Sequence, residues 1–233
     1  MSQQKPKPKV ARLVTKHDTK KKSISVLPKN PAQKNYLDTL WSKAEQVVVF
    51  GPSGTGKTYL VSTVAASLYN TKDVNKIVIT RPHVAVGEKL GFLPGDLREK
   101  CEPWALPVLD VLDTHLGKGA VDTGIKNGNI EVAPMAMMRG RSFSDSFIIC
   151  DEAQNITYHE LKMLLTRVGE GSKLVLNGDI MQSDLREGDG LTKIIELIKK
   201  YELPVPIVEF GVDDIVRSAN TKMWVTTFMK EGA

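Results

Sequence analysis

The segment Val47-Val48-Val49-Phe50-Gly51-Pro52-Ser53-Gly54-Thr55-Gly56-Lys57-Thr58 decides the fold of this chain. Its apolar start is typical of a buried strand, and it runs directly into the pattern G-x-x-x-x-G-K-[ST]. The residues that follow, 59–69, contain few helix breakers. A strand, a glycine-rich loop and a helix in this order predict a site for a nucleoside triphosphate, whereas the alternative is a glycine-rich turn without a ligand.

The polar residues of this loop have separate expected roles. A Cβ atom at any of the three glycines would obstruct the approach of backbone N–H groups to phosphate oxygens. We expect Lys57 to reach the β and γ phosphates and the Thr58 hydroxyl to bind Mg²⁺, at a helix start whose dipole favours anions. The residues predicted to bind the nucleotide here are Gly51, Pro52, Ser53, Gly54, Thr55, Gly56, Lys57, Thr58 and Tyr59.

A second apolar segment, 147–150, ends in the adjacent carboxylates Asp151 and Glu152. Because the carboxyl ends of parallel strands meet at one edge of a sheet, both should lie beside the phosphate loop. We expect Asp151 to hold the Mg²⁺ shell and Glu152 to orient the attacking water, which favours hydrolysis over phosphoryl transfer. The alternative is an ordinary exposed strand end with acidic residues.

Two more strand ends belong to the predicted site. The segment 173–177 is followed by Gly178-Asp179 and then by Gln182, which could contact the γ phosphate and report hydrolysis to a nucleic-acid path. The alternative for Gln182 is a plain turn. The segment 77–80 leads to Arg81, which could meet a polynucleotide backbone or equally form a surface salt bridge.

Several motifs together resemble the PhoH family over about residues 28–220. They are the phosphate loop, Arg81-Pro82, the segment 87–97, Met138-Arg139-Gly140-Arg141, Asp151-Glu152-Ala153-Gln154-Asn155 and Asp214-Ile215-Val216-Arg217. That family resembles the RecA-like core of superfamily 1 helicases. The resemblance therefore implies ATP binding, Mg²⁺-dependent hydrolysis and activity directed at RNA.

The resemblance also implies site residues outside the phosphate loop. Segment 31–36 is similar to the adenine-reading segment of such helicases, with Gln33 presenting its amide to the base and selecting ATP; the alternative is an exposed helix residue. One RecA-like core lacks the second wall of a helicase cleft, and the resemblance points to a hexameric ring that supplies it. Arg217 is the first candidate for the γ-phosphate contact, followed by Arg139 and Arg141, and structural pairing is the alternative for each.

Length and charge set the domain organisation. The chain has 233 residues, which accommodates one RecA-like domain, predicted at 23–233, and not two. Residues 1–30 carry a formal net charge of +8 and the remainder −3, so the basic character lies in an N-terminal arm, 1–22, expected to be extended or disordered. Such an arm could bind nucleic-acid phosphate, or could serve as a solubilising tail.

Cysteines and histidines indicate the compartment and argue against a zinc site. Cys101 and Cys150 are the two cysteines, they form no CxxC motif, and the four histidines are scattered. With no signal peptide or membrane-spanning run in view, we expect a cytoplasmic protein without a membrane partner, in the host cytoplasm if the gene is phage-encoded.

The apolar patterns alternate between strand and helix, which predicts an α/β fold with a mainly parallel sheet flanked by helices on both faces. The expected strands are 47–50, 77–80, 130–133, 146–150, 173–177 and 206–210, and the expected helices are 32–43, 57–69, 104–115, 157–168 and 190–200. Glycine-rich 117–128 is expected to form a hairpin or loop, and 87–103 a functional loop. Trp104 is expected to begin a helix as a core or interface aromatic rather than a base-stacking one.

These features predict a Mg²⁺-dependent ATPase that couples hydrolysis to binding or remodelling of RNA or another single-stranded nucleic acid as a homo-oligomeric ring. The alternative is an ATP-switched nucleic-acid-binding module without helicase activity. A small-molecule phosphotransferase is a third class, disfavoured by Glu152.

Overall fold

The structure of the protein is a computed structural model that describes residues 23–82, 103–185 and 190–231. The basic arm at 1–22, the motif at 87–97 and Cys101 lie outside the described residues, as does nearly all of the predicted functional loop at 87–103.

Six parallel strands form one sheet in the order β3-β2-β4-β5-β1-β6. Their bounds are β1 Gln46–Phe50, β2 Lys76–Thr80, β3 Ile130–Val132, β4 Ser146–Cys150, β5 Lys173–Gly178 and β6 Ile207–Glu209. The strands β1, β2, β4 and β5 are buried along most of their length and read as short apolar runs, as expected for a sheet covered on both faces. Each of the six strands matches a predicted one.

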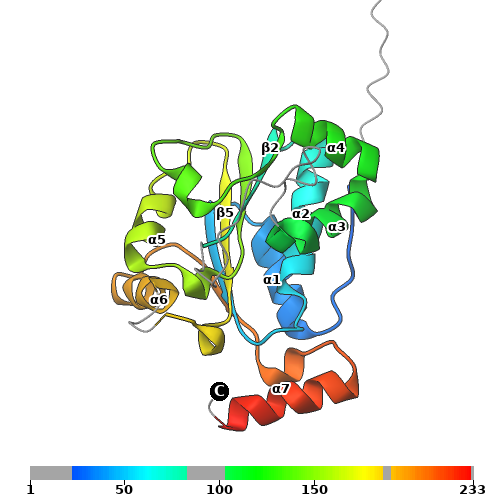
Figure 1. Ribbon diagram of the computed structural model, residues 1–233. Helices are drawn as coiled ribbons and strands as arrows, with labels where there is room; N and C mark the ends of the chain where they lie inside the picture. Colours follow the sequence, from blue (N-terminus) through cyan, green and yellow to red (C-terminus); the bar gives the residue numbers. More distant parts are fainter. Residues whose placement is uncertain (1–22, 83–102, 186–189, 232–233) are drawn as a thin grey trace, which may run out of the picture.

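Helices cover both faces of the sheet (Figure 1). One face packs against α1 Pro31–Trp41, α2 Lys57–Thr71, α3 Leu106–Leu116 and α4 Lys118–Lys126, and the other against α5 Tyr158–Leu165 and α6 Gly190–Lys200. Short 3-10 turns lie at Pro103–Ala105, Met135–Met138, Ala153–Asn155, Ile180–Gln182 and Val212–Asp214. The predicted α/β class, a parallel sheet with helices on both faces, is therefore confirmed.

The strand order determines which loops meet. Because β5 lies between β1 and β4, the end of β5 separates the phosphate loop from the acidic end of β4. The register pairs Val49 of β1 with Asn177 of β5, so Asn177 comes at the level where β1 ends. Alternation along β5 puts Asn177 on the face of Val175, which packs in the core under α1 and α2.

The prediction of a hairpin or loop at 117–128 was wrong, because the segment contains helix α4. Glycine is tolerated in this helix since Gly124 lies against the Ile130 side chain, where a Cβ atom would come within 2.8 Å of Cδ1. Burial of Val121 in the core also stabilises the helix, so tertiary packing overrides the low helix propensity of glycine.

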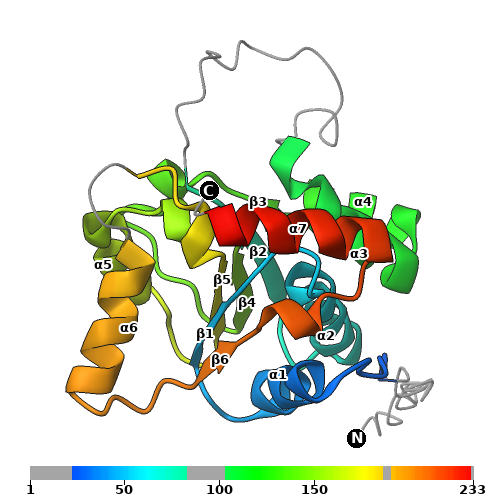
Figure 2. The ribbon, with the colours of Figure 1, turned by 90° about the horizontal axis from the view of Figure 1, so that it is seen from below.

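The C-terminal helix α7, Ala219–Glu231, lies apart from the layers, below the sheet in Figure 1 and towards the viewer in Figure 2. All of its residues are at least partly exposed, and the stacked rings of Trp224 and Phe228 are 5.6 Å apart.

Trp104 is partly buried against the core, within the 3-10 turn that precedes α3, which agrees with the expected core aromatic. Among the described residues, no helix is long and apolar enough to span a membrane.

Candidate functional site

A cavity of about 700 Å³ opens at the carboxyl ends of the strands. Its lining includes most of the predicted site residues, which come from five separate segments of the chain: Gln33, Ser53, Gly54, Gly56, Lys57, Thr58, Tyr59, Asp151, Glu152, Gln182 and Arg217. The structure thus brings together residues that are up to 184 positions apart in sequence. Its size suits a ligand of the size of a nucleotide.

The phosphate loop needs glycine for a reason beyond access to phosphate. Gly54 and Gly56 have φ values of +82° and +89°, which favour glycine. A Cβ atom on Gly54 would lie 2.7 Å from Cγ of Arg217, and one on Gly56 would lie 2.9 Å from Nε2 of Gln33. The loop is therefore packed tightly against two other predicted site residues.

The ammonium group of Lys57 lies inside the loop. Its Nζ donates to the carbonyl oxygens of Gly51 at 2.7 Å and Pro52 at 3.0 Å. Burial lowers the pKa of Lys57, and the nearby carboxylates, with Asp179 foremost, oppose that shift. A buried cation held by neutral carbonyls is well placed to exchange them for the oxygens of an anionic phosphate.

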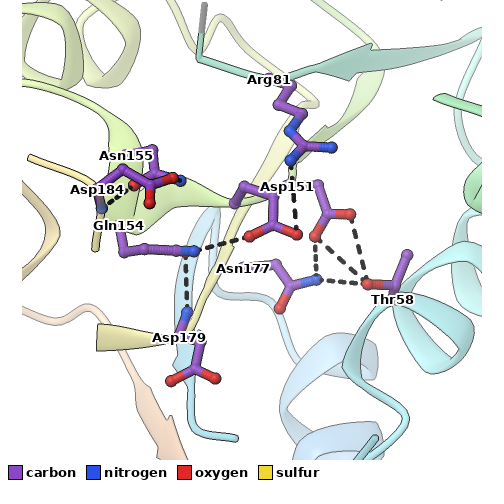
Figure 3. Close-up of polar contacts among 9 residues, drawn as sticks. Thr58, Arg81, Asp151, Gln154, Asn155, Asn177, Asp179 and Asp184 are labelled. Atoms are coloured by element: carbon purple, nitrogen blue, oxygen red, sulfur yellow. Dashed lines mark hydrogen bonds and ion pairs between the residues drawn. The ribbon is translucent and has the colours of Figure 1, made fainter. Parts of the chain in front are cut away.

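Thr58, Asp151 and Asn177 form a compact polar cluster at the cavity wall (Figure 3). The Asn177 amide donates to Oδ1 of Asp151 at 2.6 Å and to Oγ1 of Thr58 at 3.0 Å. The Thr58 hydroxyl lies 3.4 Å from Oδ1 of Asp151. Burial, reinforced by the charge of Glu152, raises the pKa of Asp151 to about 6. A cation at this cluster would favour the ionised carboxylate.

Glu152 leaves β4 with φ of +54° and is held by two side chains. Gln154 Nε2 donates to its Oε2 at 2.7 Å, and Nη2 of Arg81 lies 3.8 Å from its Oε1. The Arg81 guanidinium therefore forms an ion pair at the site, which agrees with the salt-bridge alternative. The Glu152 carboxylate remains about one-third exposed to the cavity.

Gln154 connects the acidic end of β4 with the turn after β5. Its Oε1 accepts from the backbone N–H of Asp179 at 2.9 Å, and its backbone carbonyl accepts from the Ser183 hydroxyl at 3.1 Å. Next to it, Asn155 and Asp184 exchange two hydrogen bonds of 3.2 and 2.8 Å. The same turn carries Gln182, which is exposed and lines the cavity.

Gln33 is buried, with 3% of its surface exposed, so the reading as an exposed helix residue does not hold. Its Oε1 accepts from the N–H of Lys29 at 2.8 Å, and its Nε2 donates to the carbonyl of Thr55 at 2.9 Å. These bonds fix the amide at the cavity wall. One N–H and one oxygen lone pair of the amide remain for a further partner.

The three candidate arginines lie in different places. Arg217 lines the cavity of its own chain against Gly54, so this arginine reaches the phosphate loop without a neighbouring subunit. Arg141 is paired with Glu131 through two hydrogen bonds, a structural pairing that lowers the pKa of Glu131 to about 2. Arg139 is exposed and does not belong to the cavity lining.

Sequence reasoning did not assign roles to Asn177, Asp179 and Gln154. The sequence did contain a usable signal for Asn177. This residue is an amide in an otherwise apolar strand, on the face that meets the phosphate loop, and a buried amide requires a hydrogen-bond partner. The contacts of Gln154 depend on the order of the strands in the sheet, which the sequence pattern does not determine. The apolar residues of the cavity lining, which include Val26 and Pro107, were also unassigned.

Comparison with known proteins gives one consistent family. A family model described as PhoH-like protein matches residues 25–229. The chain is 43% identical over 198 residues to Protein PhoH of Escherichia coli (strain K12), covering 83% of this chain and 55% of that protein. It is 42% identical over 206 residues to a PhoH-like protein of Bacillus subtilis (strain 168), covering 88% and 63%. The chain thus spans about half to two-thirds of the length of these relatives.

Solved structures show a more distant likeness. The UvsW helicase from Bacteriophage T4 matches with a TM-score of 0.48 and 14% identity, over 81% of this chain and 62% of that one. The SWI2/SNF2 ATPase core of Sulfolobus solfataricus in complex with dsDNA matches with a TM-score of 0.45 and 12% identity, over 82% and 45%. Likenesses this weak bear on neither substrate nor mechanism.

Proposed function

The chain belongs to the PhoH-like protein family, and on that premise we propose that it is a Mg²⁺-dependent ATPase whose turnover is coupled to RNA or another single-stranded nucleic acid. The observation that carries the proposal is the cavity in which a buried lysine, a hydroxyl and two carboxylates converge on a phosphate loop. Lys57 and the loop amides would hold the phosphates, since both present donors to an anion.

The residues present fit a Mg²⁺ ion. Thr58 has one hydroxyl hydrogen and two lone pairs, and only one lone pair is used by Asn177. The other lone pair, together with the Asp151 carboxylate, offers hard oxygen ligands, and the phosphates and water would complete the shell. When bound, the ion neutralises charge that develops on the phosphate oxygens.

Glu152 is the proposed general base that orients the attacking water. Its carboxylate reaches the cavity, and the hydrogen bond from Gln154 fixes the direction of one oxygen. Gln182 at the rim is proposed to sense the γ phosphate, and Arg217 to contact it within the same chain. Removing such an arginine costs on the order of 10³-fold or more in related phosphoryl-transfer enzymes.

Base selection is proposed to lie with Gln33. Its amide is fixed at the cavity wall and keeps a donor and an acceptor, which matches the paired donor and acceptor on the adenine edge.

The proposal also includes a single RecA-like domain at 23–233, a basic arm at 1–22, a cytoplasmic location and a homo-oligomeric ring, expected to be a hexamer. The family resemblance supports the ring.

The test is steady-state hydrolysis of ATP at fixed moderate salt, with and without single-stranded RNA and DNA, on protein of known oligomeric mass. We expect Mg²⁺-dependent turnover that polynucleotide stimulates, and Glu152→Gln should retain ATP binding while losing at least about 10²-fold in turnover. Lys57→Ala serves as the variant that loses binding itself. Turnover that polynucleotide does not change would favour the ATP-switched binding module. An equal loss of ATP binding in Glu152→Gln and Lys57→Ala would contradict the role of Glu152.

A further inference from the structure

The Glu152 carboxylate is contacted at both of its oxygens by other side chains. Gln154 donates to Oε2 at 2.7 Å, and Nη2 of Arg81 lies 3.8 Å from Oε1. The first contact is a hydrogen bond, whereas the second is too long for one and is an ion pair. Glu152 also has a φ of +54°, which residues with a side chain rarely adopt. Its surroundings therefore set the direction of this carboxylate, and the contact with Arg81 is the one more easily given up.

The sheet places Arg81 beside the acidic end of β4 but outside the cavity. Thr80 of β2 is in register with Cys150 of β4. The next residues, Arg81 and Asp151, therefore leave the sheet side by side, and Figure 3 shows the Arg81 side chain pointing from the end of β2 towards this acidic end. Glu152 lines the cavity and Arg81 does not, although the Arg81 side chain is 30% exposed. A ligand in the cavity thus meets Glu152, and Arg81 is reached from outside the cavity.

A cation next to the proposed general base slows the step that the base serves. The positive charge of Arg81 favours the ionised carboxylate, which makes Glu152 a weaker acceptor for the proton of the attacking water. Both side chains are about one-third exposed, so solvent screens the pair and keeps its effect modest. We expect such a pair to hold the rate down by roughly two- to fivefold.

A phosphate group competes well for an exposed guanidinium. The planar fork of donors on arginine matches two phosphate oxygens, and such a pair is stronger than the single contact of 3.8 Å with Glu152. The phosphates of ATP would lie on the cavity side, where Arg81 is not part of the lining. The backbone of a single-stranded nucleic acid presents a phosphate at every nucleotide and can approach from outside the cavity. The competitor that fits this position is therefore a polynucleotide.

We propose that Arg81 restrains Glu152 while no nucleic acid is bound, and that a backbone phosphate of RNA or another single-stranded nucleic acid releases the base by taking Arg81 as its partner. Arg81 is then a positioning residue, which acts on the reaction only through Glu152. This inference rests on the proposed function, since it assumes that Glu152 is the general base and that polynucleotide stimulates turnover. It accounts for stimulation without any contact between the polynucleotide and ATP.

The experiment measures steady-state ATP hydrolysis by the full chain, with Mg²⁺ at fixed moderate salt, during a titration with single-stranded RNA. In Arg81→Gln the rate without RNA should rise by roughly two- to fivefold, because the restraint is gone. The factor by which RNA stimulates should fall by the same amount, so the two proteins converge at saturating RNA. The KM for ATP should stay unchanged, because Arg81 does not line the cavity. A side chain that only supported the fold would lower the rate instead.

Three further variants complete the test. Lys193→Gln breaks an exposed ion pair with Glu196 on α6, outside the cavity lining, and should leave both rates unchanged. Arg81→Met keeps the aliphatic stem and repeats the test if Arg81→Gln fails to fold. Arg81→Lys keeps the charge and should restore both the low rate without RNA and the stimulation.

Two results would contradict this role of Arg81. A lower rate without RNA in Arg81→Gln and Arg81→Met, or a stimulation factor equal to that of the unsubstituted protein, overturns the inference alone. If no polynucleotide changes hydrolysis by the unsubstituted protein, the coupling in the proposed function fails as well.

Discussion

Asp151 shows at the level of a single residue how a site is built at the expense of stability. Its carboxylate is surrounded by buried strand ends and by Glu152, and these raise its pKa from 3.8 to about 6. The folded state therefore binds a proton more tightly than the unfolded state does. The ionised form destabilises the fold above about pH 6, and this cost fades as the pH falls from 6 towards 4.

We expect Asp151→Asn to be more stable than the unsubstituted protein by about 1–3 kcal/mol at pH 7.5, without Mg²⁺ or nucleotide, because the buried charge is gone. Urea unfolding at pH 7.5, 6.0 and 4.5 measures the difference, which should shrink as the pH falls. Asp38→Asn is the control, since Asp38 is 65% exposed in a surface pair with Lys34 and should change stability little. An Asp151→Asn protein that is less stable at pH 7.5 would show that the buried charge does not destabilise the fold.

Individual site residues differ in how far the sequence could predict them. Lys57, Thr58, Asp151 and Glu152 stand in motifs whose order along the chain already implies their meeting, and the structure places all four at one cavity. Asn177 could be found only by asking what an amide does in a buried strand. Gln154 belongs to the acidic motif, but its role carried no local signal, because one of its partners is the backbone of a turn that follows a different strand.

At the level of elements, the ends of β4 and β5 are linked by one side chain. Gln154 bonds Glu152 with its nitrogen and the N–H of Asp179 with its oxygen, so the proposed general base and the turn that carries Gln182 share a support. A change in that turn would thus reach the carboxylate through Gln154.

Gln154→Leu should lower turnover by about 10–100-fold while leaving ATP affinity nearly unchanged, because a misplaced base costs rate rather than binding. Single-turnover hydrolysis and equilibrium ATP binding separate the two quantities. Ser183→Ala is the matched control: it removes the hydrogen bond to the Gln154 backbone and leaves the contact with Glu152. Loss of ATP affinity in proportion to rate would mean that Gln154 supports the fold of the cavity and not the base.

Most elements followed from apolar patterning. Helix α7 was not predicted, and the wrong prediction at α4 has a physical reason. Runs such as Phe147–Cys150 are short and apolar at every position, which favours a strand buried between two helical layers, and β4 is buried along its whole length. Helix α4 was missed because Gly117, Gly119, Gly124 and Gly128 read as loop residues, whereas packing against β3 and α3 makes a helix of the segment. Local propensity is a weak guide where tertiary contacts are strong.

At the scale of the whole molecule, the basic charge and the candidate ATP site lie in different parts of the chain. Residues 1–22 contain eight Lys or Arg residues and one Asp, while the chain after residue 30 is net acidic. The cavity lies at the carboxyl edge of the sheet, and its wall carries Asp151, Glu152 and Asp179. A polyanion is therefore attracted mainly by the arm, so affinity for nucleic acid and hydrolysis should separate.

Removing residues 1–22 should weaken binding of single-stranded RNA and flatten its salt dependence, while hydrolysis without RNA stays unchanged. If about five of the eight basic side chains contact phosphates, the slope of log affinity against log salt should fall by about 3–4. A full-length variant with these eight residues changed to Gln is the control, because it keeps the length of the arm and loses its charge. The two proteins should behave alike. A slope that survives both changes would place the RNA-binding surface on the folded part of the chain, and the arm would then be a solubilising tail.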